Sequence, residues 1–254
     1  MSEHRMRGNL PRQLNPDVLW TGGCLDVYLG AEEKVHSHFS SYVVRGAKKC
    51  LLVDTGHPLH GPAMETAIDN FLGDRPIDYI FPTHAEFPHA GLLPKWLEKY
   101  PGAKLIGNMS DYDLYYPEFT SRFCHVEPGD AVDLGERQFR FVPAVWRDLP
   151  NTLWGFDTKD RILFVSDGFS FLHAHGDHQC AFTTSEQPDP DHRLVRIVNQ
   201  GALQWLKYLA AERTFDDIDA LLHLLRPTII APAHGAVIDS PETTLPLIKS
   251  GMLA

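Results

Sequence analysis

Hydrophobic positions along this chain recur first with the period of two that is typical of strands. Within the first sixty residues the apolar runs are short or alternating, and glycines or charged turns separate them. We expect strands at four places, residues 18–20, 25–29, 41–44 and 49–53. The wider spacing of apolar residues over 62–72 predicts the first helix.

Beyond residue 76 the pattern alternates between strands and helices. Strands are predicted at residues 77–81, 104–106, 131–134, 138–144, 152–156, 161–165 and 228–231. Helices are predicted at residues 91–100, 193–213, 215–225 and from 240 onward, and 110–119 fits a helix or a loop. Strands first, then strands mixed with helices, indicates two packed mixed sheets with helices outside. We therefore predict an α/β sandwich that occupies residues 1–254 as a single domain.

Composition restricts the possible partners. The chain has 254 residues, 43% of them hydrophobic, and its net charge of −10 argues against nucleic acid and anionic membranes. Residues 1–17 are polar and no apolar run reaches the length of a membrane span, so we predict a cytoplasmic protein. We also expect a homo-oligomer that acts on a small molecule. The cysteines lack Cys-x-x-Cys spacing and are expected to be reduced and buried, without a disulfide frame or zinc knuckle: Cys24, Cys50, Cys124 and Cys180.

Candidate chemistry gathers directly after the strand predicted at 77–81. His84, Glu86 and His89 all follow this strand closely. His84 and Glu86 stand two residues apart, so in an extended segment their side chains point the same way. Imidazole and carboxylate groups delivered into one small volume are suited to holding two cations. A polar loop whose histidines only cap and hydrogen-bond is the alternative.

Three later residues lie where other predicted strands end. Asp148 follows the strand at 138–144, Asp167 follows the strand at 161–165, and His234 follows the strand at 228–231. An α/β scaffold places its chemistry at such strand exits. Each residue alone would suit a turn or helix cap, but six potential ligands at strand exits favour a metal centre.

These motifs resemble the metallo-β-lactamase superfamily over roughly residues 40–240, which implies an αββα sandwich. Asp54-Thr55-Gly56 is similar to the first family motif, whose Asp supports the metal loop without binding metal. Within the superfamily, Glu86 and the separation between Asp148 and Asp167 resemble the flavodiiron branch. The resemblance implies two metal ions bridged by Asp167, one on His84, Glu86 and Asp148 and the other on His89 and His234.

The chain departs from the family pattern at two positions. Pro88 stands where the family has a carboxylate, so the second site is expected to be weaker. Asp148 replaces a histidine and makes the first site rich in oxygen, which favours iron or manganese over zinc. The sequence also ends without a flavodoxin-like extension, so a reductase of this type would need a separate electron donor.

Residues 173–178 contain a second histidine-rich tract. His173-Ala174-His175-Gly176-Asp177-His178 has the spelling His-x-His-x-Asp-His of zinc hydrolases. The tract follows Asp167 instead of preceding it, so we favour a loop near the mouth of the site. There His173 or His178 would relay protons or contact substrate. Metal binding by the tract, or a polar surface loop without a role, are the alternatives.

The expected chemistry follows from two adjacent cations, which lower the pKa of a shared water towards neutrality. We predict a dinuclear metallo-hydrolase of a small organic substrate, cleaving an ester or activated ether C–O bond, with Asp167, His173 and His178 at the reaction. The alternative is a non-haem di-iron protein that binds or reduces O2 or NO with an external electron donor. Aromatic residues near the ligands would suit a flat, aromatic substrate if they line the mouth: Phe87, Trp146, Trp154, Phe169 and Phe171.

Overall fold

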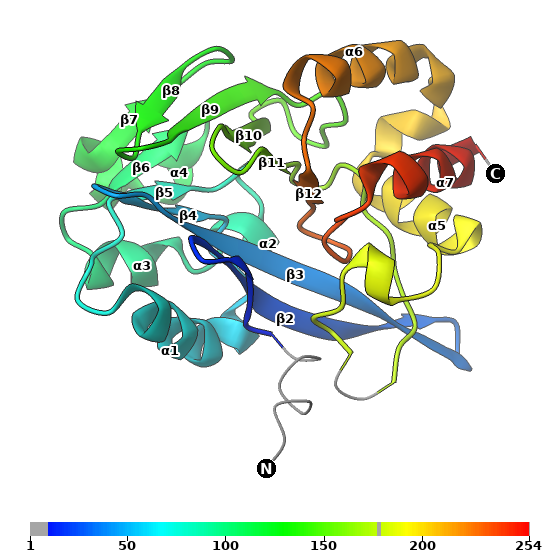
Figure 1. Ribbon diagram of the computed structural model, residues 1–254, viewed down its shortest axis with the longest axis horizontal. Coiled ribbons are helices and arrows are strands. Elements are labelled where there is room, and N and C mark those ends of the chain that lie inside the picture. Colours follow the sequence, from blue (N-terminus) through cyan, green and yellow to red (C-terminus); the bar gives the residue numbers. More distant parts are fainter. Residues whose placement is uncertain (1–9, 177–178, 254) are drawn as a thin grey trace.

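The computed structural model describes residues 10–176 and 179–253 (Figure 1). Two β-sheets pack face to face, and helices cover their outer faces (Figure 1). These layers confirm the predicted α/β sandwich. His178 lies outside the described residues, and the single domain over 1–254 stays a prediction.

The first sheet has seven strands in the order β1-β2-β3-β4-β5-β6-β7. Their bounds are Arg12–Asn15 (β1), Val18–Leu29 (β2), Glu33–Arg45 (β3), Cys50–Val53 (β4), Tyr79–Phe81 (β5), Lys104–Gly107 (β6) and Phe123–His125 (β7). Strands β1 to β4 pair antiparallel, and β4 to β7 pair parallel. The carboxyl ends of β4 and β5 therefore lie side by side, and Asp54 and His84 follow them.

The second sheet has five strands in the order β12-β11-β10-β9-β8. Their bounds are Ala131–Asp133 (β8), Gln138–Pro143 (β9), Leu153–Asp157 (β10), Ile162–Phe164 (β11) and Ile229–Ala231 (β12). Strands β11 and β12 are parallel, while the other pairs are antiparallel. Asp167 and His234 therefore leave this sheet at the same end.

Seven α-helices are found in the described residues. Their bounds are Gly61–Leu72 (α1), Phe87–Ala90 (α2), Leu93–Lys99 (α3), Tyr112–Tyr115 (α4), His192–Ala202 (α5), Phe215–Leu225 (α6) and Pro241–Leu253 (α7). α1 and α3 cover the first sheet, and α5 to α7 lie beside the second (Figure 1). In the described part of the chain, no helix combines the length and apolar character needed to cross a membrane.

Strand β4 shows how the sequence divides the core. Leu51 and Val53 contribute to the cluster between the sheets, whereas Cys50 and Leu52 contribute to the cluster under α1 and α3. Alternate side chains of a strand point to opposite faces, and both faces of this strand are buried. Burial on both sides explains why the strand is apolar throughout.

Several predicted element lengths are wrong, and β2 and α5 show why. The strands expected at 18–20 and 25–29 form one strand, because Gly22 and Gly23 stay paired to β3. A side chain at Gly22 would bring its Cβ to 2.0 Å from the Phe39 carbonyl oxygen, so the strand tolerates only glycine there. The helix expected at 193–213 ends at Ala202, because the chain turns at Leu203 to bury that side chain in the core.

Candidate metal centre

The six predicted ligands are brought together at the strand exits. His84 and Glu86 follow β5, His89 lies in α2, Asp148 follows β9, Asp167 follows β11, and His234 follows β12. Four of these residues form a group whose possible ligand atoms all lie within 4.8 Å of one another: His84, Glu86, His89 and Asp167. The two other residues contact this group directly through His84 and Asp167.

Asp167 lies between two sets of side chains. Its Oδ1 is 3.3 Å from Nε2 of His89 and 3.1 Å from Nε2 of His234. Its Oδ2 is 3.7 Å from Nε2 of His84, on the other side. One carboxylate thus presents a different oxygen to each set, which is the geometry that a bridging ligand needs.

The set around His84 is rich in oxygen. Nε2 of His84 lies 3.3 Å from Oε2 of Glu86 and 3.2 Å from Oδ2 of Asp148. The other Asp148 oxygen, Oδ1, accepts hydrogen bonds from the backbone N–H of Leu149 at 2.8 Å and from the Thr152 hydroxyl at 3.1 Å. These two donors orient the carboxylate and leave Oδ2 directed at His84.

Each of the two histidines that face Asp167 Oδ1 is held through its other nitrogen. Nδ1 of His89 lies 3.0 Å from Oδ2 of Asp54, and Nδ1 of His234 donates to the His38 carbonyl at 2.7 Å. A donating Nδ1 fixes the ring orientation and directs Nε2 into the site, as is usual for metal-binding histidines.

Thr83 and Ser166 also hold His84 and Asp54 in place, and neither residue was predicted from the sequence. Ser166 Oγ lies 3.0 Å from Nδ1 of His84 and 2.9 Å from the Thr83 hydroxyl. The backbone N–H of Thr83 donates to Asp54 at 2.7 Å. Asp54 and Ser166 both have positive φ, of 56° and 53°. Thr83 directly precedes His84, and Ser166 directly precedes Asp167. This adjacency is the only signal for the two residues in the sequence.

The electrostatics show strong coupling between the buried groups. Burial opposes ionisation of Asp167, yet His89 and His234 hold its pKa well below the usual range. Burial would likewise lower the pKa of His84, but hydrogen bonds to Asp148 and Glu86 outweigh it and raise that pKa. Burial opposes the charge on His89 as well, but Asp54 and Asp167 outweigh it and raise the pKa of that ring, so His84 and His89 hold protons more tightly than free imidazoles. Metal binding here would therefore release protons.

The donor set fits metal ions. Nε2 of His89 and Oδ1 of Asp167 are buried and 3.3 Å apart, yet neither makes a hydrogen bond in the described structure. Both atoms thus face a common point instead of each other. Three carboxylates and three imidazoles converge there, and both kinds of side chain bind divalent metal ions. The oxygen-rich set around His84 suits iron or manganese better than zinc.

Only one of the aromatic residues considered for the mouth is exposed. Phe87 is 58% exposed, and its ring packs edge-on against His57. The rest are buried at 2% exposure or less because they pack into the core: Trp146, Trp154, Phe169 and Phe171. Phe39 lies between His57 and His234 and was missed by the sequence analysis. Of the five residues, only Phe87 therefore meets the condition of lining the mouth.

His173 lies in a different cluster from Asp167. Its ring contacts Cys24, His38 and His175. Burial lowers the pKa of His173, so the ring is neutral at neutral pH and poorly suited to relay protons. Its expected role in the reaction stays a prediction.

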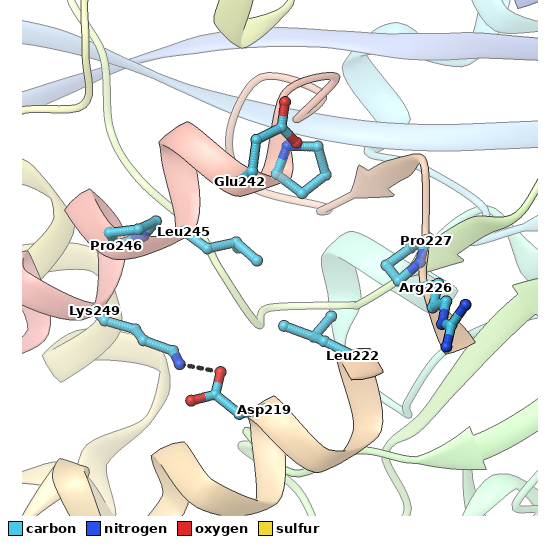
Figure 2. Close-up of a pocket in the computed structure, with 9 residues that line it drawn as sticks. Asp219, Leu222, Arg226, Pro227, Glu242, Leu245, Pro246 and Lys249 are labelled. Carbon is cyan, nitrogen blue, oxygen red and sulfur yellow. Dashed lines mark hydrogen bonds and ion pairs between the residues drawn. The ribbon is translucent and has the colours of Figure 1, made fainter. Parts of the chain in front are cut away.

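Two of the surface hollows differ in whether they reach a candidate ligand. An open hollow of about 420 Å³ reaches Asp148 from the surface, between the loop after β9 and the segment around Trp205. Figure 2 shows a second hollow of about 450 Å³ between α6 and α7, where Lys249 pairs with Asp219. None of the six candidate ligands lines the second hollow.

The family model described as the metallo-beta-lactamase superfamily matches residues 39–188, more than half of the chain. The chain belongs to this superfamily. Its relatives include the coenzyme F420H2 oxidase of Methanothermobacter marburgensis, which is 24% identical over 245 residues. That match covers 91% of this chain and 58% of the oxidase.

Two solved structures have the same fold as this chain. The rubredoxin oxygen:oxidoreductase from Desulfovibrio gigas aligns with a TM-score of 0.75 and 18% identity, covering 96% of this chain and 61% of that one. The flavodiiron protein from Giardia intestinalis aligns with a TM-score of 0.70 and 17% identity, covering 95% and 58%. This chain spans less than two thirds of the length of each of these proteins.

The comparisons correct the functional prediction. The expected hydrolysis of an ester or activated ether is wrong, because the relative is named an oxidase and the structural neighbour an oxygen:oxidoreductase. The predicted resemblance to the flavodiiron branch is confirmed, and the expected two-metal centre with iron favoured agrees with it.

Proposed function

We propose that this protein is a non-haem di-iron oxidoreductase that reduces dioxygen with electrons from an external donor. The observation that carries the two-metal centre in this proposal is the Asp167 carboxylate, of which one oxygen faces His84 and the other faces His89 and His234. The names of the relative and of the structural neighbours support the same chemistry.

In this proposal six side chains would hold two iron ions, with Asp167 shared between the two sites. His84, Glu86 and Asp148 would complete one site, and His89 and His234 the other. The bound iron would supply the redox chemistry for the reduction of dioxygen, with the external donor restoring the electrons.

The protein contributes orientation and access to this chemistry. Asp54 and the His38 carbonyl keep Nε2 of His89 and of His234 directed inward. Glu86 is the most exposed of the candidate ligands, with 53% of its side chain accessible, so small molecules approach on its side. Phe87 and Phe39 line that approach with apolar surface, which suits an uncharged diatomic substrate.

The test is iron content and dioxygen consumption measured on the same sample. Protein loaded with ferrous iron under anaerobic conditions should bind two equivalents and consume dioxygen repeatedly when ascorbate and a redox mediator are supplied. Asp167→Ala should lose at least one equivalent of iron, because it removes the bridge. Its rate should fall by about tenfold or more.

Asp189→Ala is the matched control, since it removes an exposed carboxylate from a surface loop. It should keep both iron equivalents and the full rate. Dioxygen consumption by the loaded wild type that is no faster than that of free ferrous iron at the same concentration would contradict the proposal.

We further propose a homo-oligomer that works in the cytoplasm. The acidic net charge of −10 supports a protein that stays away from nucleic acid and anionic membranes. Light scattering on the purified protein gives its mass in solution, and a monomer mass would contradict the oligomer.

A further inference from the structure

A second cluster of potential metal ligands lies outside the candidate di-iron centre. It contains two thiols and two imidazoles from distant parts of the sequence: Cys24, His173, His175 and Cys180. Two overlapping groups in this region have ligand atoms within 4.8 Å of one another, one with Cys24, His36 and His175 and one with Cys24, His38 and His173. The candidate di-iron centre contains no sulfur ligand, so the two sites differ in chemistry.

The fold brings these residues together through β2 and β3. Cys24 on β2 is paired with His38 on β3, so their side chains lie on the same face of the sheet. His173 is tied to β3 by two backbone hydrogen bonds with His36, of 2.7 and 3.0 Å. The ring of His38 donates to the Cys180 carbonyl at 2.6 Å, which holds Cys180, beyond the histidine tract, against the sheet.

Three sulfur-to-nitrogen distances in this cluster are close to those around a tetrahedral metal ion. Cys24 Sγ lies 3.4 Å from Nε2 of His173 and 3.8 Å from Nε2 of His175. Cys180 Sγ lies 3.2 Å from the same His175 nitrogen. A tetrahedral zinc ion with Zn–S of about 2.3 Å and Zn–N of about 2.0 Å holds sulfur and nitrogen ligands about 3.6 Å apart.

The tautomer of His175 leaves Nε2 free to bind a metal ion. Its Nδ1 lies 2.7 Å from the Gly176 carbonyl oxygen, which can only accept a hydrogen bond. Nδ1 therefore carries the proton, and the lone pair of Nε2 points at the sulfurs of Cys24 and Cys180. A ring that donates Nδ1–H to a backbone carbonyl while Nε2 faces the ligands is typical of metal sites.

The cluster is also incompletely satisfied by the protein. Nδ1 of His38 and Nδ1 of His173 are buried and have no hydrogen-bond partner within the described structure. Their rings stack at 4.3 Å, so both unpaired atoms belong to the same small region. Buried polar atoms without partners cost free energy, so the protein alone does not fully satisfy the imidazoles of this region.

We infer that Cys24, Cys180, His173 and His175 form a structural zinc site. Two thiolates and two imidazoles drawn into a tetrahedral set would select zinc among the common divalent ions. The ion would fasten the histidine tract to the β2–β3 hairpin. Since β3 also holds His234 through the His38 carbonyl, the site would stabilise one wall of the candidate di-iron centre. The inference is independent of the reaction at that centre.

Cobalt substitution tests this inference without reference to activity. Cobalt bound by cysteine thiolates gives a sulfur-to-cobalt charge-transfer band, and only the proposed zinc site offers sulfur. We expect the band in the wild type and also in Asp167→Ala, which removes the bridge of the other centre. Cys24→Ser, Cys180→Ser and His175→Ala should each weaken or abolish the band, together with one equivalent of zinc in metal analysis.

Cys124→Ser is the matched control, because Cys124 is an exposed free cysteine on β7. It should keep both the band and the zinc. A wild type that lacks the band, or that holds no zinc beyond the metals of the other centre, would overturn the inference. A Cys24–Cys180 disulfide in freshly purified protein, detected by mass as the loss of two hydrogens, would overturn it as well.

A second measurement covers variants that fail to fold. In the zinc-loaded wild type, a thiol reagent should modify Cys24 and Cys180 slowly, and removal of zinc by a chelator should accelerate both reactions by about tenfold or more. Cys124 reports the rate of a free thiol in the same sample. Equal rates for all three cysteines before and after chelation would contradict the zinc site.

Discussion

At the scale of single residues, the candidate metal centre depends on side chains that do not face the metals. Asp54 contacts Nδ1 of His89 with one oxygen and Thr83 with the other. It adopts a left-handed backbone conformation with φ of 56°, which costs free energy in a residue other than glycine. The fold retains this strain where it fixes the direction of a ligand.

Replacing Asp54 should therefore weaken metal binding although Asp54 is not a ligand. We expect Asp54→Ala to lower the affinity of the His89 and His234 site by about 10- to 100-fold, the usual effect of removing a partner of a metal-binding histidine. The site on His84 should change less. Competitive titration with a chromophoric chelator separates the two equivalents.

Asp54→Asn is the matched comparison, because an amide oxygen can still accept the His89 proton. It should recover part of the lost affinity. Unchanged binding of both equivalents in Asp54→Ala would show that the ring of His89 needs no orienting partner.

At the scale of elements, the short helix α2 decides how unequal the two metal sites are. Pro88 lies in its first turn and His89 follows directly. Proline suits this position, because the first N–H groups of a helix have no partner within it. It also removes the carboxylate that the family pattern has there, so Asp167 supplies the only negative charge among the proposed ligands of that site.

Stepwise chelation should therefore remove the metal on His89 and His234 first. We expect Pro88→Asp to tighten this site by about tenfold, because affinity rises with the number of charged ligands. An aspartate is also favourable in the first turn of a helix. Isothermal titration of the metal-free protein measures both equivalents.

Pro94→Asp makes the same substitution in the first turn of α3, at a position outside the proposed ligand set. It should leave both affinities unchanged. Two equally tight equivalents in the wild type would contradict the weaker second site and would require a further ligand there.

At the scale of the whole molecule, the centre lies where the two sheets meet, and the core between them fixes its geometry. Asp54 and the segment with His84 leave the first sheet, whereas Asp167 and His234 leave the second. Phe164 packs between the sheets against Tyr42 and Phe139, with ring centroids 5.3 and 5.6 Å away. The relative position of the ligands therefore depends on this packing.

Truncation of that core should destabilise the fold. We expect Phe164→Ala to lower the free energy of unfolding by about 3–5 kcal/mol, since it leaves a cavity between the sheets. Urea denaturation of the metal-free protein measures the change without the contribution of bound ions.

Tyr208→Ala removes an aromatic side chain that is 89% exposed, and should change the free energy by less than about 0.5 kcal/mol. If Phe164→Ala were as stable as Tyr208→Ala, the sheets would not be held together by the packing around Phe164.

The sequence by itself determined the local features of this protein. Apolar alternation and helical spacing placed most strands and helices, because both patterns arise from neighbours along the chain. The sequence also predicted the two packed sheets and grouped the six candidate ligands, since each follows a predicted strand. The difference between hydrolysis and oxidoreduction was not determined, because the ligand side chains serve both chemistries.

Only the tertiary structure decided what depends on distant contacts. Ser166 supports His84 from the opposite sheet, and neither sequence spacing nor residue type announces that pairing. Cys24 and Cys180 seemed isolated in the sequence, but the fold brings the sulfur atoms of both close to His175. Such contacts arise from the packing of separate elements, and packing between elements leaves no periodic trace in the sequence that forms them.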